Sequence, residues 1–115
     1  MTHVMKKGDT GPSLLKQCQD EDGAGLDLTG ATATFSMRAG SSLIIDHRPA
    51  VIFVGQLPNG LVVTQADGWI EYVWQSGDTN TVGVYESEFK ITFSDGTIET
   101  VPNEGFEQIT INENI

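Results

Sequence analysis

The residues that could carry acid-base or metal chemistry gather in two short polar segments of the chain. The first is DEDG, residues 20–23, whose carboxylates are side chains that general acid-base catalysts and calcium loops both use. A turn explains these residues better, because aspartate satisfies its own backbone in a turn and glycine adopts a positive φ there. A polar loop offers no burial to shift a carboxyl pKa, and the later ligands of a calcium loop are absent. The segment therefore predicts neither catalysis nor a metal site.

The second polar segment is DHRP, residues 46–49, where Asp46 and His47 could form part of a catalytic relay. Neighbouring residues of an extended chain point to opposite sides, and no GxSxG nucleophile motif occurs, so we interpret His47 as a surface histidine. The single cysteine, Cys18, cannot close an intrachain disulfide and lies in no CxxC motif, which favours a small buried hydrophobic residue. No phosphate-loop motif occurs either, and we expect no enzymatic activity and no cofactor.

Apolar or small residues alternate with polar ones along residues 84–93, VYESEFKITF. This period of two predicts a half-buried strand with Tyr85 and Phe93 on its inner face. Asp95 and Gly96 then supply the two positive-φ positions of a type I′ turn. The strand that returns from this turn should place Ile98 opposite Phe93 on the buried face.

Further short segments, rich in β-branched or aromatic residues and bounded by turn residues, also predict strands. They are residues 13–18, 31–38, 50–54, 61–63, 69–74 and a final strand in 106–115, which follows a turn at Asn103-Glu104-Gly105. About seven or eight short strands at this spacing indicate an all-β fold, an antiparallel β-sandwich of two sheets without a disulfide.

The segment SGDTNTVGVY, residues 76–85, has the layout of an immunoglobulin-like tyrosine corner. Asp78 precedes a Gly-x-Tyr sequence, Gly83 to Tyr85, in which the tyrosine hydroxyl would bond to backbone upstream. Trp69 or Trp74 would supply the core aromatic of such a sandwich. The alternative for Tyr85 is an ordinary core tyrosine.

Length and charge restrict the classes of protein to which the chain can belong. Its 115 residues fit one domain, which we assign to residues 11–115, preceded by a tail or arm in residues 1–10. The net charge is −10, and residues 51–115 contain only Lys90 against ten acidic residues. Such a field repels nucleic acid and anionic membrane surfaces, and no apolar run is long enough to cross a bilayer. Solubility explains the acidic residues, and docking on a basic partner is the alternative.

The segment SSLIIDHRPAVIFVGQLPNGLVV, residues 41–63, contains three apolar clusters without clean alternation. It forms either two strands buried on both faces or a hairpin that leaves apolar side chains outside. An exposed edge at Ile52, Phe53 and Val54 would require a partner strand or subunit. These three residues are the candidate interface.

Five segments in a fixed order carry a resemblance to a known family. They are KKGDTGP, LDLTGATATFSMR, GWIEYVWQSGDT, GVYESEFKITFSDG and VPNEGFEQITI, from about Lys6 to Ile111. In this order the chain resembles the N-terminal domain of phage baseplate upper proteins and the related free-standing small proteins of tailed phages. The resemblance implies an immunoglobulin-like fold with no catalytic residues.

The same resemblance implies a virion structural protein that self-associates and binds other virion proteins of the capsid, tail or fibre. Its place would be the baseplate, tail tip or fibre attachment, after synthesis in the cytoplasm of the bacterial host. Two alternatives stay open: a capsid decoration protein, and a carbohydrate or host-surface binding module that stacks its ligand on Trp69 or Trp74.

Overall fold

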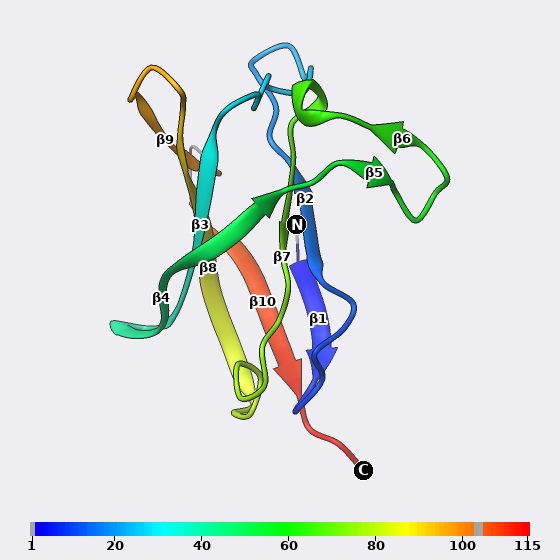
Figure 1. The fold of residues 1–115 in the computed structure, drawn as a ribbon. Coiled ribbons are helices and arrows are strands. Elements are labelled where there is room, and N and C mark those ends of the chain that lie inside the picture. The colour runs from blue at the N-terminus through cyan, green and yellow to red at the C-terminus, as the bar shows by residue number, and fades with distance from the viewer. Residues whose placement is uncertain (1, 103–104) are drawn as a thin grey trace.

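The computed structural model describes residues 2–102 and 105–115, and nearly all of their regular structure is β-strand (Figure 1). The strands are β1 (Thr2–Lys6), β2 (Leu14–Gln17), β3 (Thr32–Ala39), β4 (Ser42–Ile52), β5 (Gly55–Gln56), β6 (Val62–Val63), β7 (Trp69–Tyr72), β8 (Gly83–Thr92), β9 (Ile98–Val101) and β10 (Glu107–Asn112). One short 3-10 helix, η1 (Gln65–Asp67), lies between β6 and β7. The fold is an all-β sandwich, and its cysteine is free, as the sequence predicted. The expected turn at Asn103-Glu104 lies outside the described residues.

The strands pair in the order β1-β10-β8-β3-β4-β7-β2, and β9 also pairs with β8. Strand β4 belongs to both layers, because residues 42–50 pair with β3 and residues 51–52 pair with β7. The β2-β7-β4 pairing corresponds to strands B, E and D of an immunoglobulin domain, and β3-β8-β10 corresponds to C, F and G. On the side away from β4, an ion pair of 3.3 Å between Lys16 and Glu107 joins β2 to β10.

Residues 2–6 form strand β1, so the expectation of a tail over residues 1–10 is wrong for this segment. β1 runs parallel to β10 from Thr2 opposite Gln108 to Lys6 opposite Asn112, which also makes the sandwich not purely antiparallel. The strand is held because Met5 is 5% exposed within the core and the Lys7 amide continues the pairing with the Asn112 carbonyl at 2.8 Å.

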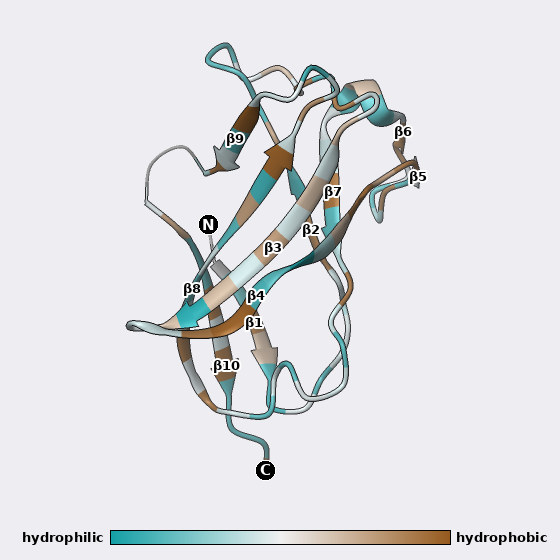
Figure 2. Ribbon diagram, turned by 60° about the vertical axis from the view of Figure 1, so that its left-hand side comes forward, coloured by the Kyte–Doolittle hydropathy of each residue, from teal (hydrophilic) through white to brown (hydrophobic). Residues whose placement is uncertain are grey.

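The core lies between the two layers, on the inner faces that the alternation predicted. Figure 2 shows hydrophobic and hydrophilic residues alternating along β8. On β8, Tyr85, Ser87, Phe89 and Ile91 are all buried. An aromatic cluster forms the centre of the core: the rings of Phe35 and Tyr72 stack at 4.4 Å, and Trp74 meets both edge-on. Trp74 is therefore the core tryptophan, whereas Trp69 on β7 is half-buried.

The β8–β9 hairpin has a register one residue away from the predicted one. Ile98 lies opposite Thr92 and is 58% exposed, so its expected position opposite Phe93 on the buried face is wrong. Gly96 has a positive φ of 89°, but Asp95 does not, because its carboxylate accepts hydrogen bonds from the Thr97 amide and hydroxyl. This local bonding replaces the type I′ turn with a three-residue loop, and the shift turns Ile98 outward.

Candidate functional site

The predicted interface residues lie at the end of β4, where the chain leaves the sandwich. Ile52 is half-buried and pairs with Ile70, and the Phe53 amide donates to the Trp69 carbonyl at 2.8 Å. Phe53 is half-buried as well, whereas Val54 is 58% exposed. Of the three, Val54 alone presents most of its surface to solvent.

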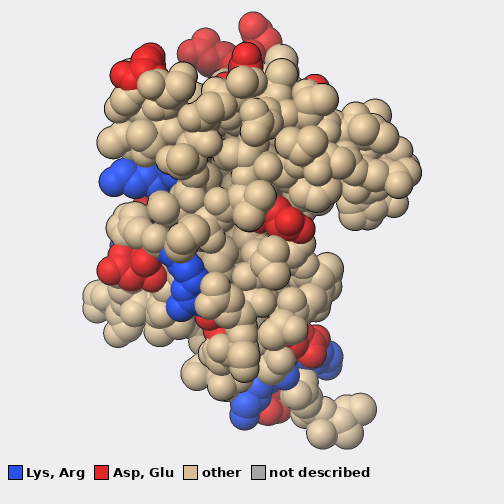
Figure 3. Space-filling view, viewed as in Figure 1, with Lys and Arg blue, Asp and Glu red and all other residues tan. Residues whose placement is uncertain are grey.

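The exposed apolar surface continues into the β5–β6 hairpin, which projects from the sandwich at the right of Figure 1. Leu61 and Val62 are 58% and 70% exposed, while Leu57 and Val63 are buried but lie outside the core cluster of the sandwich. No charged residue occurs in residues 49–66, and the projecting lobe in Figure 3 shows neither acidic nor basic side chains. The segment 41–63 thus adopts the second of its two expected arrangements, a hairpin with apolar side chains outside.

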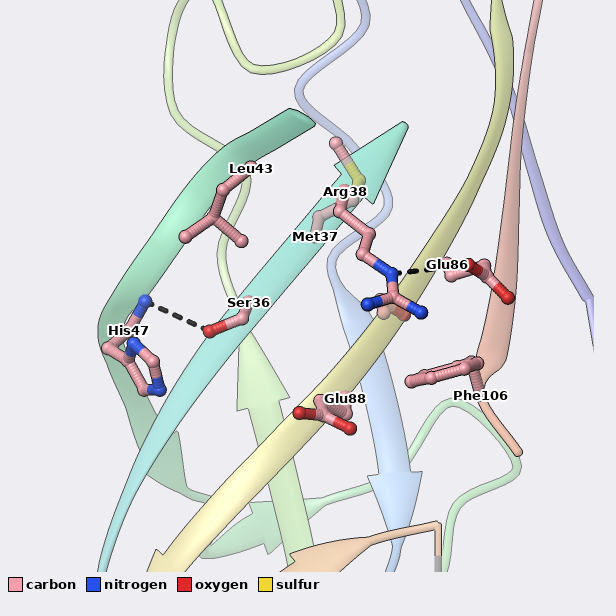
Figure 4. Close-up of a pocket in the computed structure, with 9 residues that line it drawn as sticks. Ser36, Met37, Arg38, Leu43, His47, Glu86, Glu88 and Phe106 are labelled. Atoms are coloured by element: carbon pink, nitrogen blue, oxygen red, sulfur yellow. Dashed lines mark hydrogen bonds and ion pairs between the residues drawn. The ribbon is translucent and has the colours of Figure 1, made fainter. Parts of the chain in front are cut away.

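A second surface feature is a pocket of about 110 Å³ on the outer face of β3 and β8 (Figure 4). Ser36 of β3 and Glu88 of β8 lie directly opposite each other in the sheet and both line the pocket. Leu43 of β4 lines it on one side and Phe106, just before β10, on the other. The pocket brings together the consecutive strands β3 and β4 with β8 and Phe106, which come much later in the chain, and the sequence analysis did not predict it.

Of the two glutamates that line this pocket, Glu86 has a basic partner and Glu88 has none among the described residues. Arg38 lies opposite Glu86, with Nε 3.2 Å from the Glu86 Oε1, and its guanidinium carbon lies 4.5 Å from the centre of the Phe106 ring. Glu88 has the neutral Ser36 as its cross-strand neighbour instead. Among residues 2–102 and 105–115, no ion pair or side-chain hydrogen bond reaches the Glu88 carboxylate.

His47 lies in strand β4 rather than in a loop, at an irregular point of the β3–β4 pairing. Its φ of +45° brings the ring Nδ1 to 2.5 Å from the Asp46 Oδ1, so the expectation that the two side chains point to opposite sides is wrong. The Ser36 hydroxyl accepts a hydrogen bond from the His47 backbone amide at 3.0 Å. Within the described part of the chain, no hydrogen bond joins that hydroxyl to the imidazole, so the geometry gives no activated nucleophile.

The predicted tyrosine corner contains the hydrogen bond that such a corner requires. The Tyr85 hydroxyl donates to the Thr81 carbonyl oxygen at 2.6 Å. Gly83 lies against the Tyr85 ring, where an added Cβ would be 3.6 Å from the nearest ring carbon. These residues shape the entry into β8 and present no group to a ligand.

Asp78, the other predicted corner residue, makes different contacts. Its carboxylate, 6% exposed, accepts hydrogen bonds from Arg48 Nη1 at 2.5 Å, from the Tyr72 hydroxyl at 2.6 Å and from the Gln75 amide at 2.8 Å. Burial and the bond to Asp78 raise the pKa of Tyr72 to about 12. The bond to Asp78 also raises the pKa of Arg48. This group of three side chains joins β4 to β7 where β4 changes layers.

The remaining candidates from the sequence are Cys18 and the DEDG turn, and the contacts of both stabilise the fold. Cys18 is fully buried, and burial raises the pKa of its thiol to about 12, which keeps it unreactive. In the DEDG turn, the Asp20 Oδ1 accepts hydrogen bonds from the Asp22 and Ala24 amides. Across the residues described, no group of three or more His, Cys, Asp or Glu side chains could hold a metal ion. No helix in that part of the chain is long and apolar enough to cross a membrane.

Comparisons with known proteins identify no relative. No family model matches the chain, and neither a curated protein nor a solved structure matches it.

Proposed function

We propose that this chain is a non-enzymatic structural module of a tailed bacteriophage particle that self-associates through its β5–β6 hairpin. The proposal places it at the baseplate, tail tip or fibre attachment, among other virion proteins. Two lines of reasoning support it. The order of five sequence segments resembles phage baseplate modules, and an uncharged apolar hairpin projects from a chain with a net charge of −10.

The exposed hairpin is the observation on which the proposal rests. A two-stranded hairpin is marginally stable alone, and the buried side chains of this one, Leu57 and Val63, lie outside the core cluster of the sandwich. Val54, Leu61 and Val62 gain little from folding of the monomer, since they stay 58%, 58% and 70% exposed. Complete burial of one such side chain contributes about 1.5–3 kcal/mol, so contact with the same hairpin of a second copy would stabilise a symmetric assembly.

The test replaces Val62 with aspartate and measures the oligomeric state by light scattering after size exclusion. Val62→Asp should dissociate the assembly, because it places a charge in the apolar contact, and should leave the fold of the monomer intact. Val84→Asp is the matched control: Val84 is 60% exposed on β8, outside the hairpin. Phe53 is less suitable, since it is half-buried and a charge there would disturb the monomer. A monomeric wild type, or equal loss with both variants, contradicts self-association through this hairpin.

The copy number in purified particles tests the virion role. Quantitative mass spectrometry against the major capsid protein should give a small number per particle if the chain lies at the baseplate, tail tip or fibre. A number similar to that of the capsid protein would indicate a decoration protein over the shell instead. Absence from the particles contradicts both.

Carbohydrate binding is a second candidate, favoured by one feature of β2 and β7. Trp69 lines a hollow of about 320 Å³ together with Leu15, Gln17 and Gln19, a set that offers an aromatic face and amide groups. Trp74 is 3% exposed and cannot serve as a stacking platform. If this candidate is right, a glycan array should show binding that Trp69→Ala abolishes while a correctly folded spectrum is retained. An array without bound glycans removes it.

A further inference from the structure

The outer-face pocket is lined by Ser36, Met37, Arg38, Leu43, His47, Glu86, Ser87, Glu88 and Phe106. It is too small for a typical cofactor or drug-sized ligand. Such ligands occupy roughly 300–1,000 Å³, whereas this pocket measures about 110 Å³. A space of that size accommodates a single side chain. The pocket lies on the outer face of the sheet, between β4 and the start of β10 (Figure 4). A partner protein can reach it, because Leu43 and Phe106 on its two sides are 52% and 41% exposed.

The lining of the pocket defines the chemistry of that side chain. Leu43 and Phe106 give apolar walls, against which the methylene stem of a lysine or arginine packs. Glu88, half-buried beside them, offers a carboxylate that no described residue pairs. An apolar wall that ends in an unpaired carboxylate is complementary to a long aliphatic stem that ends in a cation.

The neighbouring basic residues do not already satisfy Glu88. Arg38 is held by Glu86 and by the Phe106 ring. Lys90 follows on the same side of β8 but is exposed and forms no ion pair with Glu88 in the described structure. His47 also lines the pocket, but its ring Nδ1 is hydrogen-bonded to Asp46. The cation that would complete the pocket must therefore come from another molecule.

We propose that this pocket receives an arginine or lysine side chain of a partner protein, with Glu88 as its counter-charge. The net charge of −10 also favours a basic partner, because it attracts basic proteins and repels acidic ones. An acidic guest would face Glu88 directly and would have to displace Glu86 from Arg38. The proposal does not depend on self-association through the β5–β6 hairpin, which lies on a different part of the chain.

The test is an NMR titration of the ¹⁵N-labelled full chain with the peptide acetyl-Gly-Arg-Gly-amide. The peptide in which citrulline replaces arginine is the matched probe, because it keeps the shape of the side chain and removes its charge. The amides of Ser36, His47 and Glu88 should shift with the arginine peptide, and the citrulline peptide should bind about tenfold more weakly. Added salt should weaken the arginine complex, since the contact is electrostatic.

Two variants with the same change of charge decide the role of Glu88. Glu88→Gln should lower the affinity for the arginine peptide about tenfold, while Glu21→Gln, in an exposed turn, should leave it unchanged. Both are near-isosteric, and the spectrum itself reports whether each variant is folded. Equal binding of the two peptides, or undiminished binding to Glu88→Gln, overturns the proposal. Neither result bears on the proposed function, because that function is tested separately by the oligomeric state.

Discussion

Replacing Asp78 with alanine tests whether the group formed by Arg48, Tyr72 and Asp78 holds β4 where it passes from one layer of the sandwich to the other. The Asp78 carboxylate is 6% exposed and accepts three hydrogen bonds, from Arg48, from Tyr72 and from the Gln75 amide. The alanine variant leaves these three donors without their common acceptor. The expected effect is a loss of stability with no change of fold.

The size of the loss follows from these contacts. A hydrogen bond to a charged group contributes about 1.5–3 kcal/mol, and the lower end applies here because the Arg48 side chain is 31% exposed and water screens it. Leaving the Tyr72 hydroxyl as a buried donor without Asp78 costs about another 1–2 kcal/mol. We therefore expect Asp78→Ala to lower the free energy of unfolding by about 3 kcal/mol, or the Tm by about 12 °C in a domain of this size.

Urea and thermal unfolding measure the effect, with Asp22→Ala as the control. Asp22 is exposed in a turn, and its removal should change stability by less than about 0.5 kcal/mol. A double-mutant cycle with Arg48→Met then isolates the ion pair, for which we expect a coupling energy of at least about 1 kcal/mol. A loss below about 1 kcal/mol for Asp78→Ala, or strictly additive effects of the two substitutions, would refute the reasoning.

Two further predictions concern Tyr72 and Gly68. Burial raises the pKa of Tyr72 to about 12, above the value near 10 of an unfolded chain, so its stabilising contribution is complete below pH 10 and is lost between pH 10 and 12. Tyr72→Phe should flatten the fall in unfolding free energy across that interval in urea titrations, and an unchanged slope contradicts this. Gly68→Ala should destabilise by about 1–3 kcal/mol more than Gly96→Ala, since both glycines have positive φ but only at Gly68 would a Cβ lie 2.7 Å from backbone atoms of Cys18 and Leu26. Equal losses in thermal unfolding would show that backbone conformation alone sets the cost.

The predictions that came true from the sequence rest on interactions close in the chain. Alternation along β8 and β3 identified their inner faces, because side chains of a strand point to opposite sides in turn whatever the strand pairs with. The Asp20 turn and the burial of Cys18 follow from residue chemistry in the same way. The proposed virion role, in contrast, rests on resemblance and stays a prediction.

Two predictions failed because the local geometry depends on side-chain hydrogen bonds and backbone irregularities, which the alternation of apolar and polar residues does not reveal. The Asp95 carboxylate bonds to Thr97 and shifts the β8–β9 register by one residue, which turns Ile98 outward. His47 adopts a left-handed conformation at an irregularity of the β3–β4 pairing, which brings it beside Asp46. Both are local departures from an ideal strand or turn, and a period of two contains no information about them.

The sequence alone therefore decided that the chain forms β-strands and which side chains of β3 and β8 face inward. It also decided the net charge and the absence of catalytic motifs. Tertiary structure alone decided which distant segments meet. β1 is a strand only because β10, more than 100 residues later, offers it an edge, and the outer-face pocket exists only where β3, β4, β8 and Phe106 converge. Such contacts depend on the closure of long loops, and the composition of a short segment does not specify which remote strand will be beside it.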